Sequence, residues 1–190
     1  MRLAWPAAPG ASGTVNVVQE GSGKPWLTVR SLAAVPLTAP LRAGYSVTRS
    51  VTAVDPKAGT TAGRWARGDM LRVRVEVEAQ SDMTWVVVSD PVPAGATILG
   101  AGGGRDSAIA TRTEKRDSGY DNGAVPAFEE RSFEAFRSYF EFMPRGKHVI
   151  EYTVRLNNPG RFALPPTRVE AMYAPESFGE LPNAAVEVAP

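Results

Sequence analysis

One stretch of the sequence decides the fold: Leu71-Arg72-Val73-Arg74-Val75-Glu76-Val77-Glu78. Apolar and charged residues alternate along it, so its apolar side chains share one face of an extended chain and its four charges share the other. A strand of this kind covers a hydrophobic core on one side and meets water on the other, as in antiparallel sheets. The stretch therefore predicts a half-buried, antiparallel β-strand.

The same alternation returns at residues 148–156, where Ile150, Tyr152, Val154 and Leu156 are expected to face the core. Residues 83–88 are apolar nearly throughout and predict a central strand, which the two prolines in residues 89–95 are expected to end. Shorter strands are expected at residues 14–19, 26–31, 45–54, 96–99, 161–164, 168–173 and 185–188.

Residues 128–142 fit two patterns. Phe133, Phe136 and Phe140 have helical spacing, whereas the alternation from Phe136 to Phe142 fits one face of a strand. The Pro-Arg-Gly turn at 144–146 and the clear strand after it favour a hairpin. We therefore expect a strand from about residue 136, with a bulge or a short helical turn before it.

The chain of 190 residues contains 18 Gly and 16 Pro, a share of turn formers that favours many short elements. Turns recur every ten to fifteen residues, as in β-sandwiches. We predict an all-β, antiparallel sandwich of immunoglobulin- or fibronectin-like architecture, with at most a short helix. The polar, glycine-rich residues 100–123 are expected to form a long flexible loop. A change of composition near residue 40 separates residues 1–40 from 41–190.

Composition also excludes several functions. With 21 Lys+Arg against 20 Asp+Glu the net charge is +1, which gives no field for nucleic acid. The absence of cysteine excludes disulfides, a thiol nucleophile and a thiolate metal site, and the single histidine, His148, cannot build a histidine-rich metal site. No apolar run suits a signal peptide or a membrane span, so a soluble fragment is expected. We expect no cofactor.

The short motifs favour structural interpretations. The glycines at 100–105 are followed by neither a Gly-Lys-Ser/Thr sequence nor a predicted helix, so they indicate a loop rather than a phosphate site. Arg67-Gly68-Asp69 matches the tripeptide that integrins bind, but Gly-Asp is also an ordinary way to turn into a strand. The turn is favoured, and an adhesion or surface-recognition sandwich remains the alternative function.

Three groups of side chains bear on catalysis or metal binding. Ser107, His148 and Asp106 lack the sharp turn that presents a nucleophilic serine, so His148 is expected to be an exposed or half-buried structural residue. Four acidic residues near the Phe-rich segment are expected on the wet face of strands, paired with Arg131 and Arg137: Glu129, Glu130, Glu134 and Glu141. Four aspartates lack the dense spacing of a calcium loop: Asp90, Asp106, Asp117 and Asp121.

Three segments, taken in order, resemble the C-terminal end of bacterial α2-macroglobulin-like proteins. Residues 85–95 resemble a strand that leads into a D-x-x-P-A-G turn, and residues 140–155 resemble an F-x-x-x-P-x-G hairpin followed by Y-x-x-R. The most specific segment is residues 160–176, which match G-x-F-x-x-P-P-x-x-x-E-x-M-Y-x-P-E.

The resemblance implies that residues 41–190 form the last macroglobulin-like domain and that residues 1–40 are closing strands of a preceding CUB-like domain. It implies a non-catalytic module of an endopeptidase inhibitor, a periplasmic protease trap, with no enzyme activity. The expected partners are other domains of the same polypeptide, proteases met by the full-length protein, and a cell-wall synthesis enzyme.

In thioester-bearing relatives the last domain packs over the thioester, and a tyrosine keeps water away from it. The matching position here is Tyr173, and the expected contact surface consists of Met172, Tyr173 and Pro175. A tyrosine suits this role because its ring is a large apolar cover with a polar tip.

Overall fold

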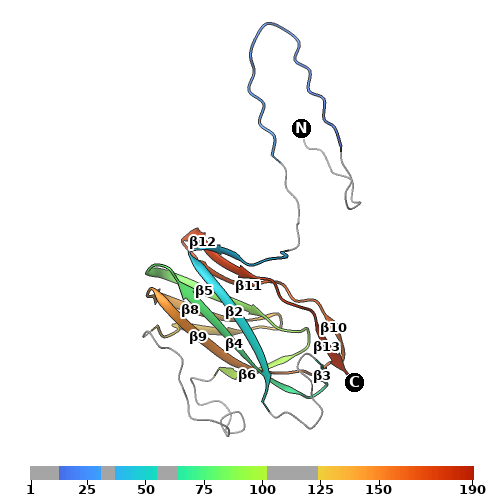
Figure 1. Ribbon diagram of the computed structural model, residues 1–190, viewed down its shortest axis with the longest axis vertical. Coiled ribbons are helices and arrows are strands. Elements are labelled where there is room, and N and C mark those ends of the chain that lie inside the picture. Colours follow the sequence, from blue (N-terminus) through green and yellow to red (C-terminus); the bar gives the residue numbers. More distant parts are fainter. Residues whose placement is uncertain (1–12, 31–36, 55–63, 102–123) are drawn as a thin grey trace. The chain divides into compact units, whose positions relative to one another are not determined.

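The computed structural model describes residues 13–30, 37–54, 64–101 and 124–190 (Figure 1). The chain divides into two units, Met1–Val35 and Pro36–Pro190, and each is described by itself. Every element in the described residues is a β-strand, and none of these residues belongs to a helix that could cross a membrane. The all-β prediction is confirmed.

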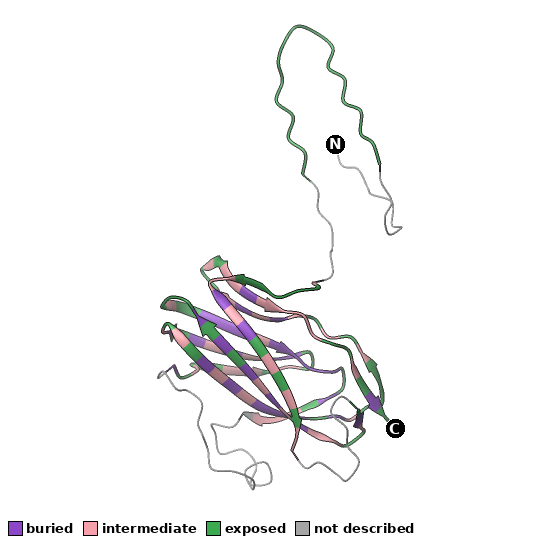
Figure 2. Cartoon of the chain, viewed as in Figure 1, coloured by how far each residue is buried: buried purple, intermediate pink, exposed green. Residues whose placement is uncertain are grey.

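In the first unit, the described residues 13–30 form no strand and are all exposed (Figure 2). The strands predicted at 14–19 and 26–31 are therefore wrong over the part that is described. The physical reason is that a strand depends on ladder partners and on a covered apolar face, whereas Trp26 here is completely exposed. That residues 1–40 close a CUB-like domain stays a prediction.

The second unit contains all the strands. They are β1 (Leu41–Ala43), β2 (Tyr45–Ala53), β3 (Trp65–Ala66), β4 (Met70–Ala79), β5 (Met83–Pro91), β6 (Thr97–Ala101), β7 (Phe128–Arg131), β8 (Ala135–Met143), β9 (Gly146–Arg155), β10 (Gly160–Phe162), β11 (Thr167–Ala171), β12 (Ala174–Leu181) and β13 (Val186–Ala189). The predicted strands from residue 45 onward are all present, within a few residues of their predicted bounds. Strands β1, β3, β7 and β12 were not predicted.

The strands form two large sheets and a small one. A six-stranded sheet has the order β1-β12-β11-β5-β8-β7, and a four-stranded sheet has the order β2-β4-β9-β6. These two sheets face each other as the layers of a sandwich, and one hydrophobic cluster draws on both (Figure 1). In the third sheet, β10-β13-β3, the β13–β3 pair is parallel; the other pairs of described strands are antiparallel.

Strand β4 behaves as its alternation predicts. Leu71, Val73, Val75 and Val77 are buried, while the charged residues between them lie on the outer face. Each apolar side chain moved from water into the core contributes roughly 1.5–3 kcal/mol to folding. On the outer face the Arg74 Nη1 atom lies 2.7 Å from a Glu151 oxygen of β9, which agrees with the antiparallel register of the two strands.

Two features of the six-stranded sheet differ from prediction. Strand β5 runs on through Ser89 and Asp90 to Pro91, because proline stands at its last position and removes no interior ladder bond. Before β8 there is no helical turn but a second strand, β7, joined to β8 by a tight turn in which the Ser132 N–H donates to the Ala135 carbonyl. Phe133 occupies that turn and is exposed, so its helical spacing was coincidental.

Candidate functional site

A hydrolase triad, which the sequence did not favour, finds no support in the position of His148. This residue is completely buried, on the inward face of β9, and its Nε2 lies 2.7 Å from the Pro144 carbonyl oxygen. The expectation of an exposed or half-buried histidine is wrong, because residue 148 has the same strand parity as the buried Ile150 and Tyr152. Ser107 and Asp106 lie outside the described residues.

The Arg67-Gly68-Asp69 tripeptide forms the tight turn that the sequence predicted. Gly68 has a φ of 94°, and its N–H donates to the Leu156 carbonyl over 2.6 Å. The Asp69 carboxylate accepts the Ala66 N–H over 2.8 Å, so it is engaged within the turn itself. The structure therefore favours a folding role for Asp69, and the adhesion alternative loses the free carboxylate that it needs.

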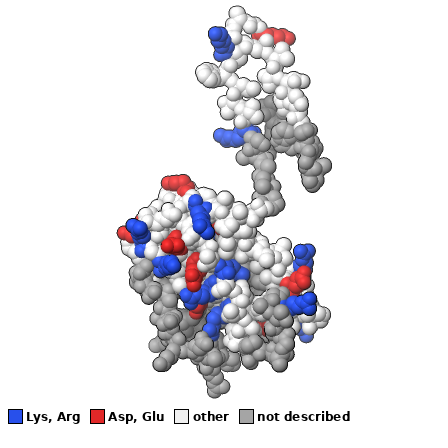
Figure 3. Space-filling view, in the orientation of Figure 1, with Lys and Arg blue, Asp and Glu red and all other residues white. Residues whose placement is uncertain are grey.

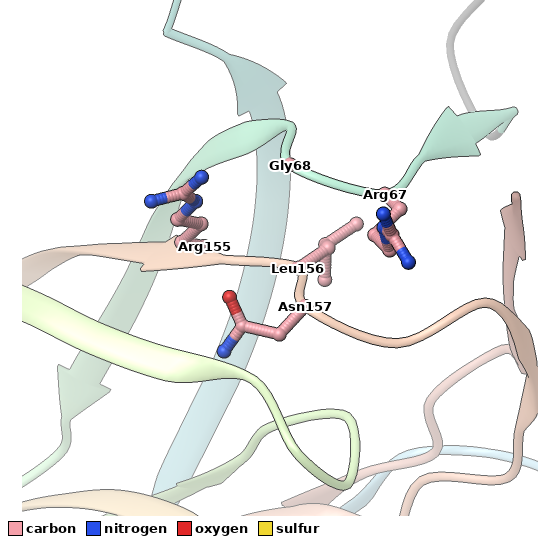
Figure 4. Close-up of a pocket in the computed structure, with 5 residues that line it drawn as sticks. All are labelled: Arg67, Gly68, Arg155, Leu156 and Asn157. Carbon is pink, nitrogen blue, oxygen red and sulfur yellow. The ribbon is translucent and has the colours of Figure 1, made fainter.

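A surface pocket of about 270 Å³ lies beside this turn (Figure 4). It is lined by Arg67, Gly68, Arg155, Leu156 and Asn157. In Figure 4 the guanidinium groups of Arg67 and Arg155 lie on opposite sides of Leu156 and do not converge. Figure 3 shows positive and negative side chains interspersed on the visible face. Because there is no convergent set of charges here, the pocket does not form a clamp for an anion.

Two of the four carboxylates near β8, Glu130 and Glu134, are paired with Arg137 as the sequence predicted. The Arg137 Nη1 and Nη2 atoms lie 2.9 Å from Glu130 and 2.7 Å from Glu134, and the Tyr139 hydroxyl also donates to Glu130. Burial raises the pKa of Glu129, and Arg131 opposes that shift. Glu130 lies opposite Arg137 on the outer face of the sheet. Glu129 lies opposite the buried Ser138 and therefore on the inward face, so the predicted wet-face position of Glu129 is wrong. Among the described residues, no cluster of three acidic or histidine side chains could hold a metal ion.

A buried polar arrangement joins the two sheets around Asp90, which is 1% exposed. The Arg49 Nε atom of β2 lies 2.9 and 3.0 Å from the two Asp90 oxygens. The hydroxyl groups of Tyr152 on β9 and Thr167 on β11 also donate to this carboxylate. We call Arg49, Asp90, Tyr152 and Thr167 the Asp90 cluster. Its groups satisfy one another, so it holds the sandwich together and offers no free reactive atom.

Electrostatics follow from this burial. Desolvation, and then the charge of Asp90, raise the pKa of Tyr152 well above its ordinary value, so the phenol stays protonated. Desolvation has the largest single effect on the pKa of Arg49 and lowers it, but the charges of Asp90 and Tyr152 and the hydrogen bonds to them together outweigh it, so the net shift is upward. This cluster was not predicted from the sequence, although one signal was available: Arg49 stands at an inward position of β2, between Val47 and Val51.

The predicted contact residues lie where β11 turns into β12. Met172 and Tyr173 form a two-residue loop closed by the Ala171–Ala174 pair, and they are 46% and 79% exposed. Pro175 follows in β12 and is also exposed, at an irregularity where the register shifts between Glu170 and Ala171. A loop of this kind projects from the sheet, so the three residues are brought together on an accessible surface.

Trp85 of β5 extends this surface. Trp85 is 45% exposed, and its indole ring meets the Tyr173 ring edge-on, with 6.3 Å between centroids and 87° between planes. Among the described residues Trp85 is the only one other than glycine with a positive φ, 54°. A bulky residue in this left-handed region costs roughly 1–2 kcal/mol relative to an extended one. We call Trp85, Met172 and Tyr173 the Tyr173 patch.

Comparison with known proteins gives one family match and several similar proteins. The sequence family described as the bacterial α2-macroglobulin MG10 domain matches residues 44–176. An α2-macroglobulin homolog of Nostoc sp. (strain PCC 7120 / SAG 25.82 / UTEX 2576) is 26% identical over 114 residues, which are 60% of this chain and 6% of that protein. The chain therefore spans only a small part of the relative that it matches.

Two solved structures from Escherichia coli share the fold. Native α2-macroglobulin from domain MG7 to the C-terminus has a TM-score of 0.64 at 18% identity, with 82% of this chain and 25% of that chain covered. E. coli α2-macroglobulin in its native conformation has a TM-score of 0.67 at 20% identity, with 83% of this chain and 10% of that chain covered. Since the family match covers well over half of the sequence, the chain belongs to the bacterial α2-macroglobulin MG10 domain family.

Proposed function

We propose that the chain is a non-catalytic structural and interaction module of a bacterial α2-macroglobulin-type endopeptidase inhibitor. The observation that carries this proposal is the family match over residues 44–176, combined with the small share of the Nostoc relative that the chain covers. A module that accounts for so little of its relative's length works through contacts with other domains of the same polypeptide.

The exposed side chains support a contact role for the β11–β12 loop. Met172, Tyr173 and Pro175 present apolar surface to the outside, and Trp and Tyr are the residue types that carry most binding energy at protein interfaces. If the parent polypeptide holds a thioester, Tyr173 covers it: the ring excludes water and small nucleophiles from the bond.

The parent protein would act in the periplasm, where it meets proteases and, as a further partner, a cell-wall synthesis enzyme. The inhibitor would act by enclosing a protease after cleavage of an upstream bait segment, rather than by blocking the protease's active site. This part of the proposal rests on the family alone.

The test compares the full polypeptide with the isolated 190-residue chain. The full polypeptide is incubated with trypsin, and cleavage of a large protein substrate and of a small peptide substrate is then measured. We expect the full polypeptide to suppress cleavage of the protein substrate while sparing the peptide, because an enclosed protease remains open to small molecules. The isolated chain should suppress neither. Tight inhibition by the isolated chain would contradict the module proposal.

The covering role of Tyr173 has its own measurement. Methylamine is a small nucleophile that attacks a thioester and releases a thiol, which can be titrated. In the full polypeptide Tyr173→Ala should release the thiol faster than the wild type, while Phe133→Ala, which removes an exposed ring from the β7–β8 turn, should not. Equal rates in all three proteins, or no released thiol in any, would refute this role.

A further inference from the structure

At Trp85 the pairing of β5 with β8 is interrupted, whereas its backbone still bonds on the side of β11. Thr84 pairs with Phe142 and Val86 pairs with Phe140 on β8, but no partner is assigned to Trp85 between them. On the β11 side the ladder continues, because the Trp85 carbonyl accepts the Met172 N–H over 2.7 Å. The strained residue is therefore anchored to the first residue of the exposed loop.

The same residue also supports the second position of that loop. The edge-on contact between the Trp85 and Tyr173 rings is a favoured geometry for aromatic pairs. Trp85 thus contacts the loop twice, by its backbone at Met172 and by its ring at Tyr173. A bulky side chain persists in a strained backbone conformation only where the surrounding structure determines it, and such residues gather at functional sites.

We propose that Trp85 is a positioning residue, whose left-handed backbone and indole ring hold the Met172–Tyr173 loop in place as a preformed docking surface for another domain of the same polypeptide. This inference rests on the proposed function, which supplies the partner. The occupant is chosen because the chain spans only 25% of the E. coli fragment and 6% of the Nostoc protein that it matches. Most of the surface available to the patch in such a polypeptide belongs to other domains.

Preorganisation gives the proposal its expected magnitude. A side chain that is already ordered does not have to be immobilised when the domains dock. Loss of the Trp85 ring should therefore weaken docking roughly twofold to tenfold. In the full polypeptide, weaker docking increases the fraction of molecules in which the Tyr173 patch is not covered by another domain. That fraction should rise by the same factor.

Hydroxyl-radical labelling with mass spectrometry measures that fraction, since Met, Trp and Tyr side chains react readily. In the full polypeptide of wild-type sequence, Met172 and Tyr173 should be labelled several times more slowly than in the isolated 190-residue chain. If the two rates are equal, the contact assigned under the proposed function is absent, and the positioning role falls with it.

The variants Trp85→Ala and Trp85→Gly in the full polypeptide then test the positioning role itself. Both should raise Tyr173 labelling at least twofold, up to the rate measured in the isolated chain. Tyr173 is already 79% exposed, so uncovering its ring directly could raise labelling by no more than about a quarter. Glycine adopts a positive φ without strain, so Trp85→Gly keeps the backbone geometry if Trp85→Ala fails to fold.

Phe128→Ala is the matched control. Phe128 is 61% exposed, contacts the Tyr139 ring, and lies on β7 at the far edge of the same sheet. This variant should leave Tyr173 labelling unchanged. Wild-type protection of Tyr173 that persists in both Trp85 variants would overturn the positioning role while the docking contact stands. An equal rise in Phe128→Ala would overturn it as well, because the effect would then be general loosening of the sheet.

Discussion

The Asp90 cluster gives the sharpest test of how this sandwich is stabilised. Asp90 is 1% exposed and accepts hydrogen bonds from Arg49, Tyr152 and Thr167, which come from three other strands in both sheets. Asp90→Ala leaves the largely buried Arg49 guanidinium, 12% exposed, without its counter-charge and two hydroxyl groups without their acceptor. Removal of one partner from a buried ion pair costs about 3–5 kcal/mol. This is a large part of the 5–15 kcal/mol that stabilises a typical domain.

The measurement is urea unfolding of the chain, followed by far-ultraviolet circular dichroism. The matched control is Glu151→Ala, which removes a carboxylate from the Arg74 ion pair on the outer face, where the side chains are 40% and 33% exposed. An exposed pair contributes at most about 1 kcal/mol. We therefore expect the unfolding midpoint to fall much further for Asp90→Ala than for Glu151→Ala.

A double variant separates the interaction from the burial. Arg49→Met combined with Asp90→Asn removes both charges, so no unpaired charge remains inside. The double variant should lose less stability than the single variants Arg49→Met and Asp90→Asn lose in sum. The difference should be about 0.5–3 kcal/mol, the range of coupling energies for residues in one network. Two results together would refute the reasoning: Asp90→Ala loses no more stability than Glu151→Ala, and the losses of Arg49→Met and Asp90→Asn add up to that of the double variant. They would indicate that water solvates the Asp90 carboxylate in solution.

Two further predictions concern Tyr45 and Gly179. Burial raises the pKa of Tyr45 from 10.0 to about 12. Because the unfolded chain loses the Tyr45 proton first, the stability that the protonated tyrosine contributes is complete below pH 10 and is lost as the pH rises toward 12. Tyr45→Phe should therefore reduce the loss of stability between pH 10 and 12, as measured by urea unfolding. At pH 8 the stability of this variant should be unchanged or higher, since the Tyr45 hydroxyl has no hydrogen-bond partner within the described residues. If the variant loses as much stability between pH 10 and 12 as the wild type, this account is wrong. Gly179→Ala should lower the free energy of unfolding by about 1–3 kcal/mol, because a Cβ atom at this position would lie 2.9 Å from the Tyr45 carbonyl oxygen. A midpoint of thermal unfolding equal to that of the wild type would show that β12 can shift away from Tyr45 and would contradict this prediction.

The candidate site could be predicted from the sequence only in part. The segment around Met172, Tyr173 and Pro175 was found because its residues match a family pattern, and the structure places all three on an exposed surface. The role of Trp85 could not be predicted in this way. Within an apolar run it has the pattern of a buried strand residue, and the sequence gives no sign of its left-handed backbone.

The sequence predicted which face of the main strands is buried, but not which strands pack together. Alternation identified the buried positions of β4 and β9, because the side chains of a strand alternate with a period of two whatever its partners are. The same rule applied to residue 148 would have placed His148 inside, so that error lay in the reasoning and not in the signal.

The sequence by itself therefore determined the class of fold, the faces of the main strands and the family, since each of these depends on residues close together in the chain. Only the tertiary structure decided that Asp90 meets Arg49, Tyr152 and Thr167, that β13 pairs in parallel with β3, and that residues 13–30 form no strand. The partners in the Asp90 cluster lie 41, 62 and 77 residues apart along the chain. Contacts at such separations are selected by how whole sheets pack and by the entropy of closing the intervening chain, which no local pattern records.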